Sequence, residues 1–357
     1  MIIHNYIRSH VIGPFFLTTL VMTSIVWLAQ AFRILDLIVS RGVDPLDFVK
    51  IAVLLLPSLI MLLLPIATML AVLYVLYRMY IDRELVIYKS IGFSSWKIAR
   101  PLLQVSLLIT IISYANSAVF LPASYKQFKD MQDYFRNNYV ALLLQESSFN
   151  SPIPGLTVYV ESKDSNEVRG ILVQDGRSDK KQTTITAARG KIIKTPGAML
   201  LELEDGTHQE KNLKDGRLSI LKFSHYVFNL ELIGKSDKAR GIDPSELTLQ
   251  QLWQSIQRQE PGVPIAKGKA NFHQRISWPL YSFTLSLLVL AIIVASPEYK
   301  RRTSAMKYIF GGILSGLILT LTAMSTNLGM RFPVAFAVPY ISHVVIIIWS
   351  CWRLQRY

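Results

Sequence analysis

Long apolar runs separated by short charged segments dominate the hydropathy pattern of this chain. Six of these runs are long enough for the roughly 20 helical residues that cross a bilayer. They begin near Val11, Lys50, Pro101, Ile276, Lys307 and Pro333. The pattern therefore predicts six transmembrane helices.

The first run also has features of a cleavable signal sequence. Arg8 precedes it, and Ala29-Gln30-Ala31 imitates a small-residue cleavage site. The run is longer than the usual signal core of roughly 7 to 15 residues. It also continues through Phe32-Arg33 without a small-residue exit. We therefore expect a retained helix.

The stretch between the third and fourth apolar runs has a different pattern. Short β-branched and aromatic segments, partly alternating with polar residues, are separated by Asp-Gly and Pro-Gly turn signals. They include LTVYVES, RGILVQDGR, TTITAARGKIIKT, MLLELEDGTHQE and LSILKFSHYVFNLEL. We expect an all-β sandwich or jelly roll here, with Asp205-Gly206 and Asp215-Gly216 as hairpin turns.

The segment IDPSELTLQQLWQSIQRQ follows the β segments and is typical of an amphipathic helix. Asp243 is its expected N-cap and Pro244 its first helical residue. The predicted fold class is therefore a membrane α-helical protein with an inserted all-β domain. Helices one to three occupy residues 1–121, the β domain with its helical linkers 122–272, and helices four to six 273–357.

Basic residues in the short loops predict the orientation of the chain. The loop from Arg78 to Arg100 carries five Lys and Arg against two acidic residues, and EYKRRTSAMK carries four against one. Positive loops face the cytoplasm. Both termini are then cytoplasmic, and the β domain lies outside. In a Gram-negative cell these sides correspond to a multi-pass protein of the inner membrane with a periplasmic β domain.

Composition and charge agree with a membrane protein. Hydrophobic residues make up 51% of the 357 residues, more than is usual in a soluble domain. The net charge is +14, but residues 123–274 hold 21 basic and 18 acidic residues, so +11 lies on the segments around the apolar runs. That distribution indicates membrane topology and argues against a nucleic-acid partner. The single cysteine, Cys351, leaves no intrachain disulfide.

The sequence carries no recognisable catalytic motif. It contains no HExxH, GxSxG, CxxC or GxxxxGK[ST] pattern. Its histidines show no spacing that would hold a metal. They are His4, His10, His208, His225, His273 and His343. We therefore expect no catalytic residue, no metal site and no cofactor, and no ATP hydrolysis by this chain itself.

Small residues and prolines in the apolar runs predict where helices pack or bend. Gly312 and Gly316 have the GxxxG spacing that lets two helices approach closely in lipid, either within the chain or between subunits. Pro57 and Pro65 interrupt the second run, and each removes a backbone donor. The resulting bends serve either packing or gating.

Two arginines lie at the expected outer ends of helices. An arginine at this level is costly in hydrocarbon and faces a cavity, a partner or the headgroups. For Arg33 the structural alternatives are snorkelling to the interface or an ion pair with Asp36. Arg331, just before the sixth helix, invites the same two interpretations.

The segment DRELVIYKSIG lies between the second and third helices and mixes charges with bulky apolar residues. We expect a short helix, at about residues 81–93, with Leu85, Tyr88 and Ile91 near one face and Gly92 as its C-terminal cap. A segment that transmits force from a cytoplasmic partner needs apolar side chains to dock and a charge to set the register. Glu84 is the candidate for that charge.

Several of these segments resemble one known family. They are YIRSHVIGPFFLTTLVMTSIVWLAQAFRILDLIV, RELVIYKSIGFS, the β domain and NFHQRISWPLYSF. Over nearly the whole chain they resemble the LptF/LptG permeases of the lipopolysaccharide export ABC transporter. The stretch AFRILDLIV is more similar to the LptF branch. The resemblance implies six helices with a periplasmic β-jellyroll, paired with a second permease (LptG, or LptF if this chain is LptG-like).

The resemblance also implies roles for particular residues. An LptB ATPase dimer would dock on the coupling helix, at Glu84, Leu85, Tyr88 and Gly92, with Arg83 in place of the family's usual small polar residue. Arg33 would bind lipopolysaccharide phosphates, and Arg331, at the same outer level, is a second candidate for this role. The lipid would then pass along the β domain to LptC and LptA, by strand positions such as Val158, Val160 and Leu172.

Two other hypotheses assign the chain to a different class of protein. A permease of another lipid or lipoprotein system usually has four helices with its soluble domain after the first, which the six-run spacing argues against. A membrane enzyme acting on lipid or glycan would need carboxylates or a metal cluster at one membrane level, and the sequence shows neither.

Overall fold

The computed structural model describes most of the chain. The described residues are 2–39, 45–142, 146–153, 155–164, 167–176, 181–195, 198–213, 215–229, 241–260, 262–295 and 301–356. Contacts between residues divide the chain into two units. The helical unit contains Met1–Asp36, Pro45–Lys129 and Arg240–Tyr357, and the β unit contains Leu37–Asp44 and Asp130–Ala239.

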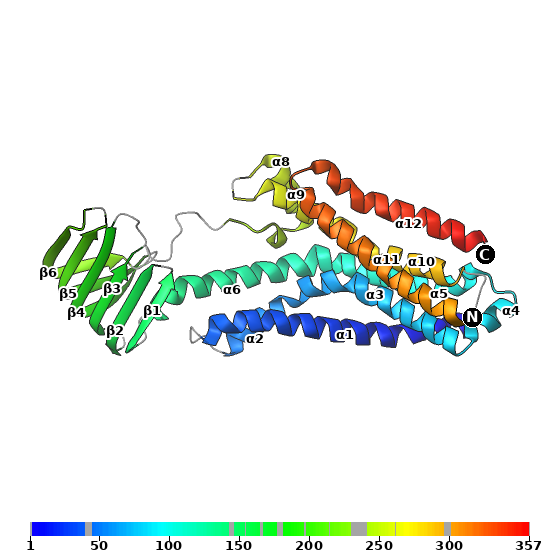
Figure 1. Cartoon of the computed structure of the whole chain (residues 1–357), viewed down its shortest axis with the longest axis horizontal. Coiled ribbons are helices and arrows are strands. Elements are labelled where there is room, and N and C mark those ends of the chain that lie inside the picture. Colours follow the sequence, from blue (N-terminus) through cyan, green and yellow to red (C-terminus); the bar gives the residue numbers. More distant parts are fainter. Residues whose placement is uncertain are drawn as a thin grey trace. The chain divides into compact units, whose positions relative to one another are not determined.

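Helices account for most of the described residues (Figure 1). They are α1 (Ile2–Val39), α2 (Pro45–Leu54), α3 (Leu56–Ile81), α4 (Glu84–Ser90), α5 (Ser95–Ala115), the π-helix η1 (Asn116–Phe120), α6 (Leu121–Leu142), η2 (Pro244–Glu246), α8 (Leu249–Arg258), α9 (Ile265–Ser277), η3 (Trp278–Leu280), α10 (Tyr281–Ile293), α11 (Arg301–Leu328), η4 (Pro333–Phe336) and α12 (Ala337–Arg356).

Six helical segments among the described residues are long and apolar enough to cross a membrane, as the hydropathy pattern predicts. They are His4–Arg33, Leu46–Ile81, Ser95–Asp133, Ile265–Ile293, Met306–Leu328 and Pro333–Arg356. The prediction of six membrane helices with an inserted β domain is confirmed.

The second span breaks next to Pro57, as predicted, but not at Pro65. Helix α2 ends at Leu54, and α3 begins after Leu55 with Pro57 in its first turn. Proline is tolerated there because the first-turn N–H groups have no partner within the helix. Pro65 lies inside α3, which continues past it.

Helix α10 forms the centre of the helical unit. It packs against α3, α5, α11 and α12, and all but one of its residues are buried. The outer helices α1, α11 and α12 leave most of their apolar side chains exposed. In Figure 1 the N-terminal end of α1, helix α4 and the C-terminal end of α12 lie at the same end of this unit.

The β unit contains one antiparallel sheet of six described strands. They are β1 (Ser148–Ile153), β2 (Leu156–Asp164), β3 (Glu167–Asp175), β4 (Lys181–Thr195), β5 (Ala198–Asn212) and β6 (Leu218–Asn229). The strands pair in chain order from β1 to β6, each with the next. One face carries a buried apolar cluster that includes Val173, Ile185 and Leu203.

One of the two predicted hairpin turns is correct and the other is wrong. Asp215-Gly216 lies in the turn from β5 to β6, where Gly216 has a φ of 66° and its N–H donates to the Asn212 carbonyl at 2.9 Å. Asp205-Gly206 instead lies inside β5. Asp205 has a φ of 52°, and pairing continues in the same register on both sides of it. The dipeptide therefore distorts a long strand instead of ending it.

The segment after the β unit begins as predicted but divides into two helices. Asp243 caps the 3-10 turn η2, and Pro244 is its first residue. The turn ends at Glu246, and α8 starts afresh with Thr248 as its own N-cap. The Thr248 hydroxyl accepts from the Gln251 N–H while the Gln251 side chain accepts from the Thr248 N–H. This reciprocal capping box separates the two elements.

Candidate functional site

Helix α4 connects the second and third spans and ends in a complete C-terminal cap. Gly92 has a φ of 81°, which favours glycine. Its N–H donates to the Lys89 carbonyl at 3.0 Å, and the Phe93 N–H donates to the Tyr88 carbonyl at 2.9 Å. The rings of Tyr88 and Phe93 lie 5.8 Å apart. These bonds and this contact form a Schellman motif, which explains why the helix stops here.

One side of α4 packs inside the chain. Leu85 is only 1% exposed and joins the core of the helical unit. Glu84 is half-buried, and its Oε1 accepts a hydrogen bond of 2.8 Å from the Tyr6 hydroxyl on α1. Tyr88 is also half-buried. Burial, and secondarily the charge of Glu84, raises the pKa of Tyr88.

The opposite side of α4 exposes three large apolar residues. Val86 is 42% exposed, Ile87 55% and Ile91 60%. We call these three residues the α4 patch. The spacing of Leu85, Tyr88 and Ile91 predicts one shared face, but Ile91 is exposed whereas Leu85 is buried against the chain's own helices. A docking partner would meet the α4 patch and not Leu85.

Lys89 fixes the end of α4 to the start of α5. Its Nζ donates to the Ser95 Oγ at 2.6 Å. Burial lowers the pKa of Lys89 below its usual value. Ser94 caps α5 by accepting from the Lys97 N–H. The turn between α4 and α5 is thus held by short-range polar contacts.

The two arginines that the sequence predicts at outer helix ends are both accessible. Arg33, at the end of the first span, and Arg331, between α11 and η4, are exposed in the isolated chain. An exposed guanidinium can receive an anionic group in a bidentate geometry. The side chain of Asp36, the alternative partner of Arg33, lies outside the described part of the chain.

The glycines of α11 divide between a packed side and an open side. Gly312 is half-buried, and a Cβ there would meet Leu73 of α3 at 3.8 Å. Gly316 is exposed, and a Cβ there would meet nothing within 4 Å. Gly312 therefore packs within this chain, whereas Gly316 leaves a smooth surface facing outward.

The predicted strand positions lie on two different faces of the sheet. Val158 and Val160 are 1% and 0% exposed and pair with Val173 and Ile171 on the buried face. Leu172 pairs with Tyr159 instead, on the opposite face. The three positions expected along the lipid path therefore sample both faces, because side chains of neighbouring positions in a strand point to opposite sides.

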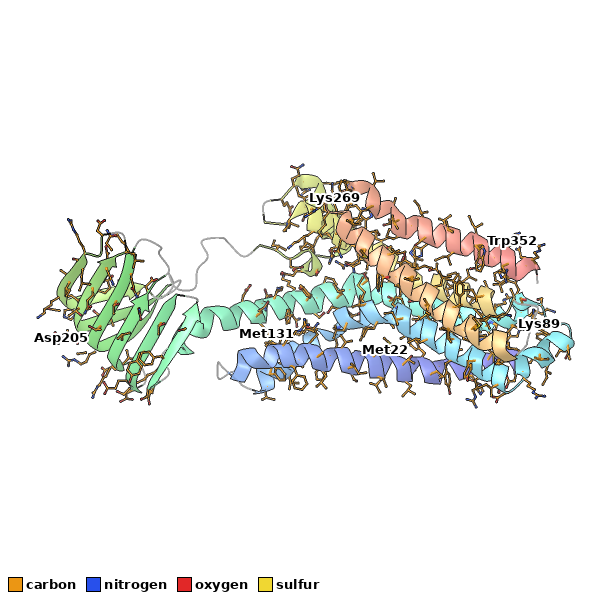
Figure 2. All side chains as sticks on the ribbon, viewed as in Figure 1. Met22, Lys89, Met131, Asp205, Lys269 and Trp352 are labelled. Atoms are coloured by element: carbon orange, nitrogen blue, oxygen red, sulfur yellow. The ribbon has the colours of Figure 1, made fainter. Side chains whose placement is uncertain are left out.

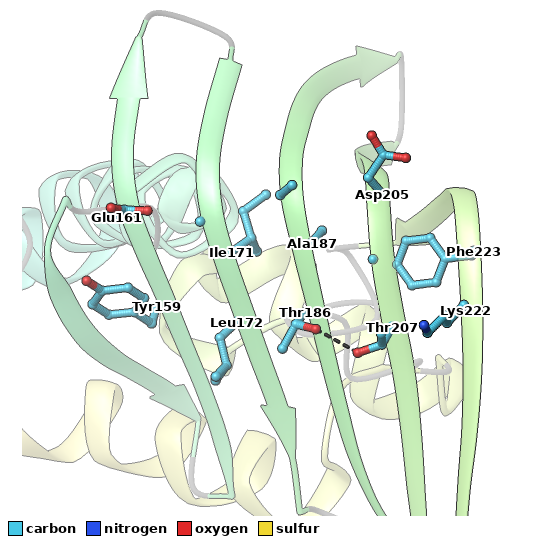
Figure 3. Close-up of a pocket in the computed structure, with 13 residues that line it drawn as sticks. Tyr159, Glu161, Ile171, Leu172, Thr186, Ala187, Asp205, Thr207, Lys222 and Phe223 are labelled. Carbon is cyan, nitrogen blue, oxygen red and sulfur yellow. Dashed lines mark hydrogen bonds between the residues drawn. The ribbon is translucent and has the colours of Figure 1, made fainter.

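The face with Leu172 carries an open groove of about 790 Å³ (Figure 3). One row of paired residues crosses it, from Leu172 on β3 through Thr186 on β4 and Thr207 on β5 to Lys222 on β6. The Thr186 and Thr207 hydroxyls share a hydrogen bond of 2.7 Å. The groove is therefore mixed in polarity, in contrast to the apolar opposite face.

A buried arginine that sequence reasoning missed joins three segments of the helical unit. Arg275 on α9 is 1% exposed. Its Nη1 donates to the Leu247 carbonyl at 2.6 Å, and its Nη2 donates to the Ser117 carbonyl in η1. A π-helix shifts the pattern of backbone hydrogen bonds, so carbonyl groups there need other donors. The interrupted apolar pattern around Arg275 is the only signal that the sequence offered.

The described residues contain no group of three or more His, Cys, Asp or Glu that could hold a metal ion. The site consists of an exposed apolar patch on α4, exposed cations and an apolar sheet face. These features and the six spans define a multi-pass membrane protein with an inserted β domain.

Comparison with known proteins identifies the family. The sequence model described as "Lipopolysaccharide export system permease LptF/LptG" matches residues 5–356. The chain therefore belongs to this family, whose members are permease subunits and not catalytic ones. An uncharacterized protein of Rickettsia prowazekii (strain Madrid E) is 29% identical over 316 residues, which cover 88% of this chain and 87% of that protein.

Proposed function

We propose that this chain is one permease half of a lipopolysaccharide exporter and that it is the LptF-like half. It extracts lipopolysaccharide from the outer leaflet of the inner membrane and passes it to a periplasmic bridge of LptC and LptA. A second permease completes the membrane cavity, and a separate LptB ATPase dimer supplies the energy. The six spans form the membrane part, and the strands β1 to β6 form the periplasmic part.

The observation that carries this proposal is the α4 patch in a chain of this family. The segment between the second and third spans buries Leu85 for its own anchoring but leaves Val86, Ile87 and Ile91 in solvent. Exposed apolar residues grouped together indicate an interaction surface. The termini lie at the same end of the helical unit as α4 (Figure 1), and Lys89, labelled in Figure 2, is one of several basic residues there. A basic end is the cytoplasmic end, where an ATPase would dock.

The outer part of the helical unit supplies the lipid contacts. Arg33 and Arg331 are exposed cations that bind the lipid phosphates. The exposed apolar side chains of α1, among them Phe16 and Leu20, provide a wall for acyl chains. The open surface around Gly316 receives a helix of the second permease.

Substitutions in the α4 patch test the docking step. An aspartate at Ile87 puts a charge into an apolar contact, and the loss of about 2 kcal/mol would weaken ATPase binding roughly thirtyfold. We therefore expect Ile87→Asp to enter the membrane normally and to lose the ATPase on purification. Ile242→Asp, at an exposed isoleucine outside α4, is the matched control. Normal ATPase recovery with Ile87→Asp would reject this docking surface.

Photocrosslinking tests the route through the β unit. Crosslinkers at Val158 and Val160 probe the buried apolar face, and one at Leu172 probes the opposite face as the control. We expect capture of lipopolysaccharide at Val158 and Val160 only while ATP is being hydrolysed. Capture at Leu172 alone would move the lipid path to the other face. No capture at any of the three, in a complex that exports lipid, would remove the β unit from the path.

A further inference from the structure

The C-terminal end of α12 carries two tryptophans, each in contact with an arginine one turn further along the helix. The guanidinium carbon of Arg353 lies 5.6 Å from the centroid of the Trp349 ring, and that of Arg356 lies 5.3 Å from the centroid of the Trp352 ring. Both distances are in the range of a cation–π contact. Trp349 is 38% exposed and Trp352, labelled in Figure 2, is 53% exposed. The two pairs therefore lie at the surface of the helical unit.

A cation–π contact occupies one face of a guanidinium and leaves the N–H groups along its edge. Those N–H groups form the planar fork that matches a phosphate in a bidentate geometry. Arg356 is exposed, and its contact with the Trp352 ring is the interaction described for its side chain. Because the ring already orients the guanidinium, the side chain loses less freedom when an anion binds. Arg356 is therefore preorganised to receive a phosphate.

The helices around α12 supply no negative charge. The α12 segment contains no Asp or Glu, and it has Arg353 and Arg356 in its last turn. Helices α5, α10 and α11, which contact α12, contain no acidic residue either. An anion that complements the two arginines does not come from these helices.

An exposed apolar stripe leads along α12 to this end. Ile341, Val345, Ile348 and Trp352 follow one another at helical spacing and are 53% to 64% exposed. The 11 positions from Ile341 to Trp352 correspond to about 16 Å at 1.5 Å per residue. One leaflet supplies about half of the roughly 30 Å hydrocarbon core. The stripe thus matches the acyl chains of one leaflet, and Arg356 follows it one turn later, at the level of the headgroups.

We infer that the C-terminal end of α12 binds an anionic phospholipid of the surrounding bilayer. Arg356, in contact with Trp352, holds the phosphate, Arg353 adds a second positive charge beside it, and the acyl chains lie along the apolar stripe. The basic loops predict that this end lies in the cytoplasmic leaflet, which contains anionic lipids. A zwitterionic lipid carries its own cation next to the phosphate, so the two arginines favour a headgroup with a net negative charge.

This inference goes beyond the proposed function. It concerns a lipid that stays bound as part of the membrane, whereas the proposed function concerns a lipid that is moved. The lipid site depends on α12 and its two cation–π pairs, and it requires neither the ATPase nor a second permease. A failure of one proposal therefore leaves the other standing.

Quenching of tryptophan fluorescence by brominated lipids tests the site, because bromine quenches only at short range. The full chain is reconstituted into phosphatidylcholine vesicles in which a minority of the lipid is brominated phosphatidylglycerol or brominated phosphatidylcholine. Arg356→Gln removes the charge, and Arg356→Lys keeps the charge but loses the planar fork. Arg258→Gln, at an exposed arginine of α8, is the matched control. The other tryptophans contribute alike in all four proteins, so the comparison is made between variants.

The measured quantity is the fraction of brominated phosphatidylcholine that quenches as strongly as a given fraction of brominated phosphatidylglycerol. For the wild type we expect this ratio to be roughly tenfold, the scale that one or two arginines near an anionic lipid provide. Arg356→Gln should lower the ratio to about twofold, and Arg356→Lys should give an intermediate value. Arg258→Gln should keep the wild-type ratio. Because Arg356 is exposed in the last turn of α12, its variants should fold normally.

Each contrary result would overturn the inference in a different way. Equal quenching by the two lipids in the wild type would mean that no anionic lipid is selected at this end. A wild-type ratio in Arg356→Gln would place the selection elsewhere on the chain. An equal loss in Arg258→Gln would indicate attraction by overall charge and not by a site. A wild-type ratio in Arg356→Lys would contradict the bidentate geometry on which the site rests.

Discussion

The contacts that stabilise the interior of the helical unit differ in kind from those that stabilise the β unit. In the helical unit, polar side chains of one helix repeatedly donate to backbone carbonyls of another. Trp278 donates to the Leu62 carbonyl at 3.1 Å, Tyr308 to that of Leu76 at 3.1 Å and Asn116 to that of Pro57 at 2.8 Å. In lipid, burial of apolar surface gives neighbouring helices no preference, so such bonds contribute to their arrangement.

The β unit depends on its ladder of backbone bonds and on the division between its two faces. Val160, Ile171 and Leu203 form an apolar face, and the ion pairs described in the unit are exposed, such as Lys181 with Glu210. Buried polar groups therefore contribute to the structure of the helical unit, whereas the charges of the β unit lie where water screens them. Four predictions test this contrast.

The largest effect is expected at Arg33, an exposed arginine of the helical unit. Arg33→Glu replaces the cation proposed to bind lipid phosphates with a repelling anion, and we expect export to be nearly abolished at normal protein level and stability. Arg33→Lys keeps the charge and loses the bidentate geometry, so it should be milder. Lipopolysaccharide release from proteoliposomes measures both. If Arg33→Glu exports normally, Arg33 is an interfacial anchor, and the phosphates are held at Arg331 or by the second permease.

The next largest effect is expected at Arg275, the buried arginine, and it should concern stability first. Arg275→Met leaves the Ser117 and Leu247 carbonyls without their donor, at about 1–3 kcal/mol for each buried orphan. Denaturant unfolding in detergent should therefore show a clearly lower midpoint. Arg258→Met, at an exposed arginine of α8, is the control and should change little. Equal midpoints for the two variants would contradict the structural role of the buried contact.

A smaller effect is expected at Gly206 in the β unit. A Cβ there would overlap the Thr186 carbonyl oxygen and the Phe223 ring. Because a backbone oxygen of a paired strand cannot move alone, Gly206→Ala should cost about 1–3 kcal/mol. Faster hydrogen exchange of β5 and its neighbours in the full chain would report this loss. Gly176→Ala is the control, since its Cβ would lie 3.5 Å from the nearest oxygen, an ordinary contact. Unchanged exchange in Gly206→Ala would mean that the strands tolerate the extra methyl group.

The smallest effect is expected at the exposed pair of Lys181 and Glu210, whose nearest atoms lie 2.6 Å apart. The hydrogen bond from Lys181 lowers the pKa of Glu210. A lowered folded-state pKa stabilises the fold fully above the unfolded pKa, and this contribution is lost as pH falls through the folded value. The protection of β4 and β5 against hydrogen exchange, corrected for the intrinsic exchange rate at each pH, should thus fall slightly more on acidification in the wild type than in Glu210→Gln. A large difference between them would contradict the screened character of this surface.

Much of the architecture follows from the sequence because it depends on local pattern. Apolar length determines which segments span a membrane, Pro57 marks where α3 begins, and Gly92 ends α4 because the chain there needs a positive φ. The β unit is recognisable from its alternating segments for the same reason. These features depend on residues that are close together in the sequence, so the sequence alone is enough to predict them.

Only the tertiary structure determined which side of each element faces inward and which distant residues meet. Leu85 and Ile91 have the same apolar character, yet one lies in the core and the other in solvent, because α3 and α1 cover only one side of α4. Asp205-Gly206 has turn chemistry, but pairing with β4 and β6 keeps it within a strand. The bond between Tyr6 and Glu84 joins residues 78 positions apart. No local pattern contains such a contact, because it exists only once the helices have packed.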